Sequence, residues 1–354
     1  MATLERTIER IGLPDQTARA KARARLDRLI MPHWALGRLM DLAVDLAGIT
    51  GQVPPRVDRK VIVTMAGDHG VVAEGVSLYP QAVTAQMVKG FVSGRAAVNA
   101  LARLNRASVV VVDMGVAADL GRLAAQGRII TGRVAAGTQS IARGPAMTLQ
   151  QARRAVEAGI EVAEELGPQT DVFGTGDMGI GNTTPSAAIA AVVTGAAVEE
   201  VTGRGTGIDD RRLAHKMAVV RRAIERNRPN PADGLDVLAK VGGFEIGGIA
   251  GLILGAAAQR KPVLVDGFIS TAGALIAHCL APKVRHCLIA AHRSQENGHG
   301  RMQRHLGLTP LLDLGMRLGE GTGAALAMNL VEAAARIVTE VATFEEASVS
   351  RAES

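Results

Sequence analysis

The chain has 354 residues and a formal net charge of +6 at pH 7, with 47% hydrophobic but only 2% aromatic residues. This length can bury a substantial core, which must be built from Ala, Val, Leu, Ile and Met. The positive charge would attract a phosphate-bearing substrate or a nucleic acid. The shortage of aromatic side chains argues against binding of single strands by base stacking, so we expect no nucleic-acid partner.

Cysteine usage and hydropathy exclude further classes. Cys279 and Cys287 fit neither a disulfide framework nor a zinc-ligand spacing, and we interpret them as small buried residues with no metal site. The N-terminus lacks the apolar core of a secretory signal. The longest apolar stretches, 187–198 and 246–258, are shorter than the ~20 residues that a membrane span needs. We therefore expect a cytoplasmic protein without a membrane span.

The first 50 residues show helical patterns. Breaks at Gly12-Leu13-Pro14 and at Met31-Pro32 predict three helices, the second from about Thr17 to Ile30 and the third from about Leu36 to Ala47. The third carries apolar residues at the 3–4 spacing of a buried stripe. The proline-containing segment from Gly51 to Asp58 is interpreted as a connector.

From Lys60 onward, short apolar runs alternate with helical segments. The runs are Val61–Met65, Val109–Val112, Asp171–Phe173, Val263–Val265 and Cys287–Ala290. The predicted helices are 83–91, 95–104, 148–166 and 209–227, with a capping box of Thr148 and Gln151 opening the third. Strands apolar on both faces are typical of a parallel sheet covered by helices. The alternation therefore predicts an α/β fold with a doubly wound, mostly parallel sheet, which binds ligands beyond the carboxyl ends of its strands.

The last predicted helix, from about Gly323 to Val341, is Ala-rich and would pack on the N-terminal helices. We therefore predict two domains. Residues 51–322 would form an α/β Rossmann-like domain for substrate binding and catalysis, and residues 1–50 and 323–354 a small helical domain. The tail after Phe344 is expected to fray.

The stretch from Phe173 to Ser186, FGTGDMGIGNTTPS, is the most informative part of the chain. Its glycines are Gly174, Gly176, Gly179 and Gly181. After this predicted loop, Thr184 would be a helix N-cap and Pro185 the first helical residue. Bare amides and a positive helix end would then face a bound anion, with phosphate as the leading candidate. The alternative is a tight crossover turn, although four glycines exceed what one turn needs.

The same stretch contains the pattern G-x-G-x-x-G, with Glu199 about 20 residues further on, as in dinucleotide-binding proteins. In that fingerprint the third glycine already lies on the helix, whereas here Asn182-Thr183-Thr184-Pro185 would delay the helix. We therefore favour a single phosphate and keep an NAD-dependent oxidoreductase as the alternative. Met114 stands where pyrophosphate-sugar phosphoribosyltransferases have a second acid, which argues against a magnesium-clamped pyrophosphate.

A second candidate phosphate element is Gly203-Arg204-Gly205-Thr206-Gly207, with Lys216 on the helix that follows. Two amide-rich loops and one lysine would hold a monophosphate without a metal, although Lys216 is equally compatible with an exposed helix position. Glu320 stands between two glycines. Burial would raise its pKa and make it a usable general base, whereas a carboxylate interacting with the helix dipole fits the spacing equally well.

Several motifs in the same order resemble one family. They are Ala66–Gly70, Glu74–Val76 with Tyr79–Thr84, Gly176–Thr184, Lys240–Phe244, Asp266–Phe268 and Arg317–Gly321. These motifs make the chain resemble the nicotinate-nucleotide–dimethylbenzimidazole phosphoribosyltransferases of cobalamin lower-ligand biosynthesis. The resemblance runs from about Ile30 to Ala342.

The resemblance implies transfer of ribose 5-phosphate from nicotinate mononucleotide to 5,6-dimethylbenzimidazole, giving α-ribazole 5′-phosphate and nicotinate with inversion at the anomeric carbon. It implies that Glu320 is the general base and that no metal or cofactor is needed. Asp177 is assigned as the second catalytic residue, and it stands where the family commonly has Glu. Its side chain is one methylene shorter, which would loosen positioning. The family also implies a homodimer.

The same resemblance supplies the binding residues. The phosphate and nucleotide site maps onto Gly176, Gly179, Gly205, Lys216 and Ser294, the last of these near the departing nicotinate. The base pocket maps onto Met178, Ile180, Leu318 and Gly319, and either Tyr79 or Met87 is expected to face the aromatic base. Another acceptor, such as adenine or a phenol, remains an alternative. The segment Pro32–Arg38 departs from the family's usual sequence, so its contribution to the site is left open.

Overall fold

The computed structural model of the chain describes residues 3–350 and is built around one six-stranded sheet. Its strands are β1 (Lys60–Gly67), β2 (Ser108–Gly115), β3 (Ile130–Thr131), β4 (Val172–Met178), β5 (Val263–Val265) and β6 (Leu288–Ala290). All pairs are parallel, in the order β3-β2-β1-β4-β5-β6. The winding direction reverses between β1 and β4, which confirms the predicted doubly wound α/β fold and places a ligand crevice at this point. The edge strand β3 was not predicted, because two residues give no pattern.

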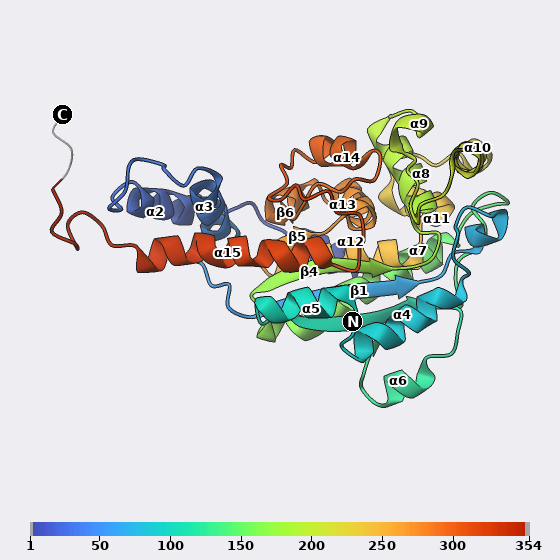
Figure 1. Cartoon of the computed structure of the whole chain (residues 1–354), viewed down its shortest axis with the longest axis horizontal. Coiled ribbons are helices and arrows are strands. Elements are labelled where there is room, and N and C mark those ends of the chain that lie inside the picture. Colours follow the sequence, from blue (N-terminus) through green and yellow to red (C-terminus); the bar gives the residue numbers. More distant parts are fainter. Residues whose placement is uncertain (1–2, 351–354) are drawn as a thin grey trace.

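Helices cover both faces of the sheet (Figure 1). They are α1 (Leu4–Glu9), α2 (Gln16–Leu26), α3 (Arg38–Thr50), α4 (Ala82–Val92), α5 (Ala97–Leu104), α6 (Gly121–Ala125), α7 (Leu149–Leu166), α8 (Thr183–Thr194), α9 (Val198–Val201), α10 (Asp210–Asn227), α11 (Gly234–Val241), α12 (Phe244–Ala258), α13 (Phe268–Leu280), α14 (His299–His305) and α15 (Thr322–Glu340). The predicted helices are all present with ends shifted by a few residues, and Thr148 and Gln151 form the predicted capping box. Within residues 3–350, no helix combines the length and apolar character needed to cross a membrane.

Two apolar layers sandwich the sheet. On one face, α12 and α13 pack together with Val61, Val63 and Met65 of β1, and on the other, α4, α5 and α15 pack with Ile62 and Ala66. Alternate residues of one strand thus enter opposite layers, as the period of a β-strand dictates. This is why the predicted strand segments are apolar without interruption.

The long helix α15 links the sheet to the N-terminal helices. Its first turns pack on β4 and α5, and further along it contacts α2 and α3 (Figure 1). The Arg25 guanidinium of α2 donates hydrogen bonds to the carbonyls of Val338 and Val341 at the C-terminal end of α15. The division into an α/β domain and a small helical domain stays a prediction, and residues 351–354 of the predicted frayed tail lie outside the described residues.

The glycine-rich stretch corrects the predicted boundary between strand and loop. Strand β4 continues to Met178, so that Gly174 and Gly176 are strand residues rather than loop residues. A Cβ atom at Gly176 would lie only 2.3 Å from the carbonyl oxygen of Glu320. Glycine is therefore needed here for close packing of another segment on the strand, and not for a turn.

The predicted start of the following helix is also wrong. Helix α8 begins at Thr183 with Asn182 as its N-cap, so the predicted N-cap at Thr184 and first helical residue at Pro185 come too late. The Thr184 amide already donates to the Gly181 carbonyl at 3.0 Å, which begins the helical turn earlier. Proline is tolerated in this first turn because the amides there have no intrahelical acceptor.

Helices α7 and α12 pack backbone to backbone. A Cβ atom at Gly159 of α7 would lie 2.0 Å from the Gly248 carbonyl oxygen of α12. We expect Gly159→Ala to lower the free energy of unfolding by about 1–3 kcal/mol, because the helices must separate to admit the methyl group. Urea unfolding followed by circular dichroism would measure this change.

The matched control is Gly90→Ala in α4, where a Cβ atom would meet no atom within 4 Å. This control should raise the free energy of unfolding by about 0.5–1 kcal/mol, because alanine loses less conformational entropy on folding. Equal stabilities of Gly159→Ala and the wild-type protein would contradict the close helix contact.

Candidate active site

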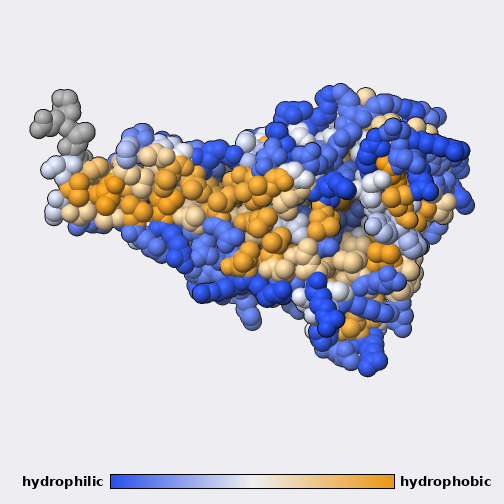
Figure 2. All heavy atoms as spheres, viewed as in Figure 1, coloured by the Kyte–Doolittle hydropathy of each residue, from blue (hydrophilic) through white to orange (hydrophobic). Residues whose placement is uncertain are grey.

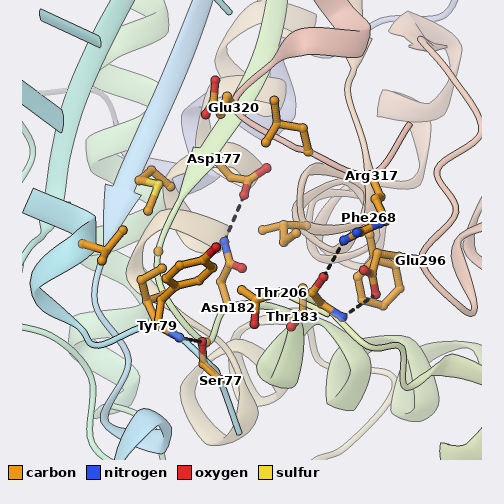
Figure 3. Close-up of a pocket in the computed structure, with 18 of the residues that line it drawn as sticks. Ser77, Tyr79, Asp177, Asn182, Thr183, Thr206, Phe268, Glu296, Arg317 and Glu320 are labelled. Carbon is orange, nitrogen blue, oxygen red and sulfur yellow. Dashed lines mark hydrogen bonds between the residues drawn. The ribbon is translucent and has the colours of Figure 1, made fainter. Parts of the chain in front are cut away.

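A cavity of about 550 Å³ lies beyond the carboxyl ends of β4, β5 and β6. Its lining comes from six segments: 76–87, 177–183, 205–206, 268–269, 294–296 and 317–320. The volume is in the range of sites that bind small molecules. Figure 3 shows Tyr79 on one side of the cavity, with Phe268, Glu296 and Arg317 on the other.

The structure brings most of the predicted site residues together in this cavity. Its lining includes Tyr79, Met87, Asp177, Met178, Gly179, Ile180, Gly205, Ser294, Leu318 and Glu320. Gly176, Lys216 and Gly319 are not part of the lining. Gly176 packs beneath the Glu320 backbone, and Gly319 lies against the Asp177 carboxylate, where a Cβ atom would be 3.2 Å from Oδ1. These two residues therefore shape the positions of the acids.

Three elements hold Glu320 in place. The residue precedes α15 with a left-handed φ of 65°. Its carbonyl oxygen accepts a hydrogen bond from the Thr64 hydroxyl of β1 at 3.0 Å and packs on Gly176 of β4. Its carboxylate oxygen Oε2 accepts a hydrogen bond from the Val98 amide of α5 at 3.3 Å.

Burial changes the proton affinity of Glu320. The residue is 6% exposed, and burial raises the pKa of its carboxyl group because the charged form loses solvation. The Val98 amide opposes this rise of the pKa, whereas the nearby Asp266 carboxylate adds to it. A carboxylate with a raised pKa is a stronger proton acceptor at neutral pH.

Asp177 is a second buried acid in the same cavity. Its Oδ2 atom accepts a hydrogen bond from the Asn182 side-chain amide at 3.0 Å (Figure 3), and Oδ1 has no hydrogen-bond partner in the described part of the chain. Burial raises the pKa of Asp177 well above its ordinary value, the Asp266 carboxylate raises it further, and Asn182 opposes the shift. Burial and the repulsion from neighbouring acids thus both favour the protonated form of Asp177.

The opposite wall carries positive charge. Lys216 of α10 is 1% exposed, and its ammonium group donates hydrogen bonds to the Thr183 hydroxyl at 2.7 Å and to the Gly203 carbonyl at 3.2 Å. Burial lowers the pKa of Lys216 to about 8, and the Glu296 carboxylate opposes that fall. The lysine therefore places its charge behind Thr183 and Gly205, beside the N-terminal end of α8, where an anion is favoured.

Arg317 and Glu296 connect this wall to other elements. Arg317 donates a hydrogen bond to the Gly205 carbonyl at 3.0 Å, and the Gly205 amide donates to the Glu296 carboxylate at 3.4 Å. Both residues line the cavity, as do Asn182 and Thr206. None of these four was predicted as a site residue from the sequence. Arg317, Asn182 and Thr206 lie inside motifs that the sequence does reveal. Glu296 lies in no such motif, because only the fold brings it to Gly205.

Comparison with known proteins defines the class. A family model described as phosphoribosyltransferase matches residues 11–349. A protein of Syntrophotalea carbinolica is 60% identical over 99% of this chain and 99% of its own length, and one of Desulfotalea psychrophila is 59% identical over 100% of each chain. Both are named nicotinate-nucleotide–dimethylbenzimidazole phosphoribosyltransferase.

A solved structure agrees with these relatives. The crystal structure of the Thermus thermophilus protein of the same name has a TM-score of 0.90 and 45% identity, and the match covers 96% of this chain and 100% of that chain. The chain therefore belongs to the nicotinate-nucleotide–dimethylbenzimidazole phosphoribosyltransferase family. None of these relatives supports the alternative of a dinucleotide oxidoreductase.

The raised pKa of Asp177 predicts a gain in stability for Asp177→Asn. Because the folded-state pKa is above the unfolded value of about 3.9, protonation stabilises the fold at low pH, and this stability is lost as the pH rises through the folded-state pKa. The asparagine side chain of the variant does not titrate in this pH range. Its free energy of unfolding should therefore exceed that of the wild-type protein increasingly as the pH rises above about 4.

Thermal unfolding between pH 4 and pH 8 would measure this difference, and Asp58→Asn at an exposed position is the control that should show no such gain. A wild-type protein more stable than Asp177→Asn at neutral pH would contradict the assignment of Asp177 as a buried acid with a raised pKa.

Proposed function

We propose that this enzyme transfers ribose 5-phosphate from nicotinate mononucleotide to 5,6-dimethylbenzimidazole, producing α-ribazole 5′-phosphate and nicotinate for cobalamin biosynthesis. The observation that carries the proposal is one cavity with a buried carboxylate, Glu320, at one end and a wall backed by the Lys216 charge. The names of the close relatives support this choice of donor and acceptor.

Glu320 is the proposed general base. One nitrogen of the benzimidazole attacks C1′ of the ribose, and the proton on the other nitrogen passes to the Glu320 carboxylate. The bond from C1′ to the nicotinate nitrogen breaks, and its electron pair neutralises the pyridinium charge. The pKa of Glu320, raised by burial, suits this proton transfer. Removal of the proton keeps positive charge from accumulating on the acceptor ring.

The acceptor ring would occupy the apolar part of the lining. Tyr79, Met87, Met178, Ile180 and Leu318 supply aromatic, thioether and aliphatic surface there. Aromatic rings and methionine sulfur interact favourably with a flat aromatic ligand. In this arrangement Asp177 would face the ribose, where a carboxylate stabilises the positive charge that develops as the nicotinate leaves.

The phosphate would bind at the opposite wall. Gly179 and Gly205 line the cavity, and their backbone amides would bind the phosphate there, while Lys216 adds a positive charge from behind Gly205. Ser294 would lie near the departing nicotinate, and Gly176 supports the nucleotide site through its packing against Glu320. The Glu296 carboxylate now accepts the Gly205 amide, so an incoming phosphate would have to displace it.

The homodimer and the cytoplasmic location stay predictions. Hydrophobic residues gather over α15 and α5 on one face of the molecule (Figure 2), and Leu104 at the end of α5 is 69% exposed. A surface of this kind is typical of a site that another protein covers, and it supports the dimer.

Product analysis tests the proposed function. The protein is incubated with nicotinate mononucleotide and dimethylbenzimidazole in the presence of a chelator, with adenine and a phenol as competing acceptors. We expect α-ribazole 5′-phosphate and an equal amount of nicotinate. Binding of NAD without any release of nicotinate would contradict the proposal, and a product made only from a competing acceptor would change the assigned base.

Glu320→Gln should lower kcat by about 10²- to 10⁴-fold, because the amide cannot accept the acceptor's proton. Binding of both substrates, measured by calorimetry, should persist because the side chains have nearly the same shape. Glu340→Gln, at the exposed far end of the same helix, is the matched control and should retain the wild-type rate. Unchanged turnover of Glu320→Gln would remove Glu320 as the base.

Lys216→Met should raise KM for nicotinate mononucleotide by about 10- to 100-fold, because the phosphate would lose the positive charge that stands behind Thr183 and Gly205. In the wild-type protein, KM should rise as the pH passes about 8, where Lys216 loses its charge. This rise should be absent from the variant. Lys283→Met at an exposed position is the control, and an unaltered KM in Lys216→Met would count against the phosphate assignment.

A further inference from the structure

The first turn of α15 is held by a carboxylate from another element. Asp266 follows β5 directly and is fully buried. Its Oδ2 atom accepts the Gly321 amide at 3.2 Å, and its Oδ1 atom accepts the Ala324 amide at 3.0 Å. Gly321 is the N-cap residue and has no side chain that could satisfy these amides. Asp266 therefore caps the helix from the sheet.

This cap acts directly beside Glu320. Asp266 holds the amide of the next residue, Gly321, while Thr64 of β1 holds the carbonyl of Glu320 itself. Glu320 has a left-handed φ of 65°, which is costly for a residue with a side chain. Such a conformation persists only where the surroundings fix it. Hydrogen bonds from two strands provide that fixation.

His292 borders the same carboxylate. The residue follows β6, is 1% exposed, and places its Nε2 atom 3.8 Å from Asp266 Oδ1. Neither of its ring nitrogens has a hydrogen-bond partner among residues 3–350. The imidazole therefore lies beside the Asp266 carboxylate and accepts no hydrogen bond from the amides of α15.

We propose that Asp266 is a positioning residue for the transfer reaction: it fixes the first turn of α15, and with it Glu320, and its carboxyl group acts electrostatically on that of Glu320. This inference rests on the proposed role of Glu320 as the base. It adds a residue that lies outside the cavity lining and that acts on the reaction through Glu320.

The surroundings of Glu320 determine how removal of the Asp266 carboxylate should change the pKa of Glu320. Asp177 from β4 and Asp266 after β5 are the acids that face it, His292 faces Asp266, and Arg317 precedes Glu320 in its own segment. The element α5 contributes the neutral Val98 amide. Since the Asp266 carboxylate raises the pKa of Glu320, loss of that charge should lower it.

The test is the pH profile of kcat for Asp266→Asn. We expect kcat to fall by about 10- to 100-fold, because a displaced base loses rate, and KM for nicotinate mononucleotide to stay near the wild-type value. The acid limb of the profile should move to lower pH. Asp266→Glu keeps the charge but displaces the first turn, so its kcat should fall while its acid limb stays in place.

Asp113→Asn is the matched control. Asp113 is also a buried acid at the carboxyl end of a strand and accepts backbone amides from Gly115 and Val116. This variant should leave the acid limb unmoved. Thermal unfolding identifies variants that do not fold. If Asp266→Asn does not fold, Asp266→Glu carries the test alone, and a wild-type kcat of Asp266→Glu would overturn the inference.

An acid limb of Asp266→Asn at the wild-type position, or an equal shift in Asp113→Asn, would overturn the role of Asp266. Loss of activity in Glu320→Gln would in that case leave the proposed base intact. Activity that survives in Glu320→Gln would instead contradict the proposed function itself, whatever the behaviour of Asp266→Asn.

Discussion

The close contact between Gly176 of β4 and the backbone of Glu320 is the constraint on which the candidate site depends. It is possible only because Gly176 has no side chain, and it brings the residue before α15 onto the carboxyl end of the central strand. Asp177 follows Gly176 in the same strand, so one contact delivers both acids to one cavity. Burial raises the pKa values of both acids, and the Asp266 carboxylate raises them further. The raised pKa values lower the stability of the fold at neutral pH and make Glu320 a better proton acceptor.

The cavity separates its charges along its length. Asp177 and Glu320 lie at one end, whereas Lys216, Arg317 and the N-terminal end of α8 surround the Gly205 loop, with the Glu296 carboxylate beside the Gly205 amide. A substrate with an anionic phosphate and a reacting carbon some distance away would therefore bind in one orientation. The apolar lining between these ends offers a surface for the flat acceptor ring. Orientation of the nucleotide and activation of the acceptor thus follow from the same distribution of residues.

The sequence predicted those features that depend on local pattern. Unbroken apolar runs predicted the parallel strands, and the motifs around Glu320, Asp177 and Gly205 predicted most of the cavity lining. Two of the errors have the same physical cause, which is tertiary contact. Strand β4 continues through Gly176 because α15 packs there, although glycine favours loops in isolation. Glu296 reaches the Gly205 loop only after the chain has folded, so no spacing in the sequence could reveal it.

The most direct measurement is a crystal structure of the inactive Glu320→Gln protein with nicotinate mononucleotide and dimethylbenzimidazole bound. We expect the side chain at position 320 to lie about 2.6–3.2 Å from a ring nitrogen of the acceptor. We also expect the phosphate oxygens to lie at Gly179 and Gly205, on the wall backed by Lys216. An acceptor ring remote from position 320, or a phosphate bound at the end of the cavity where the acids lie, would contradict the proposed mechanism.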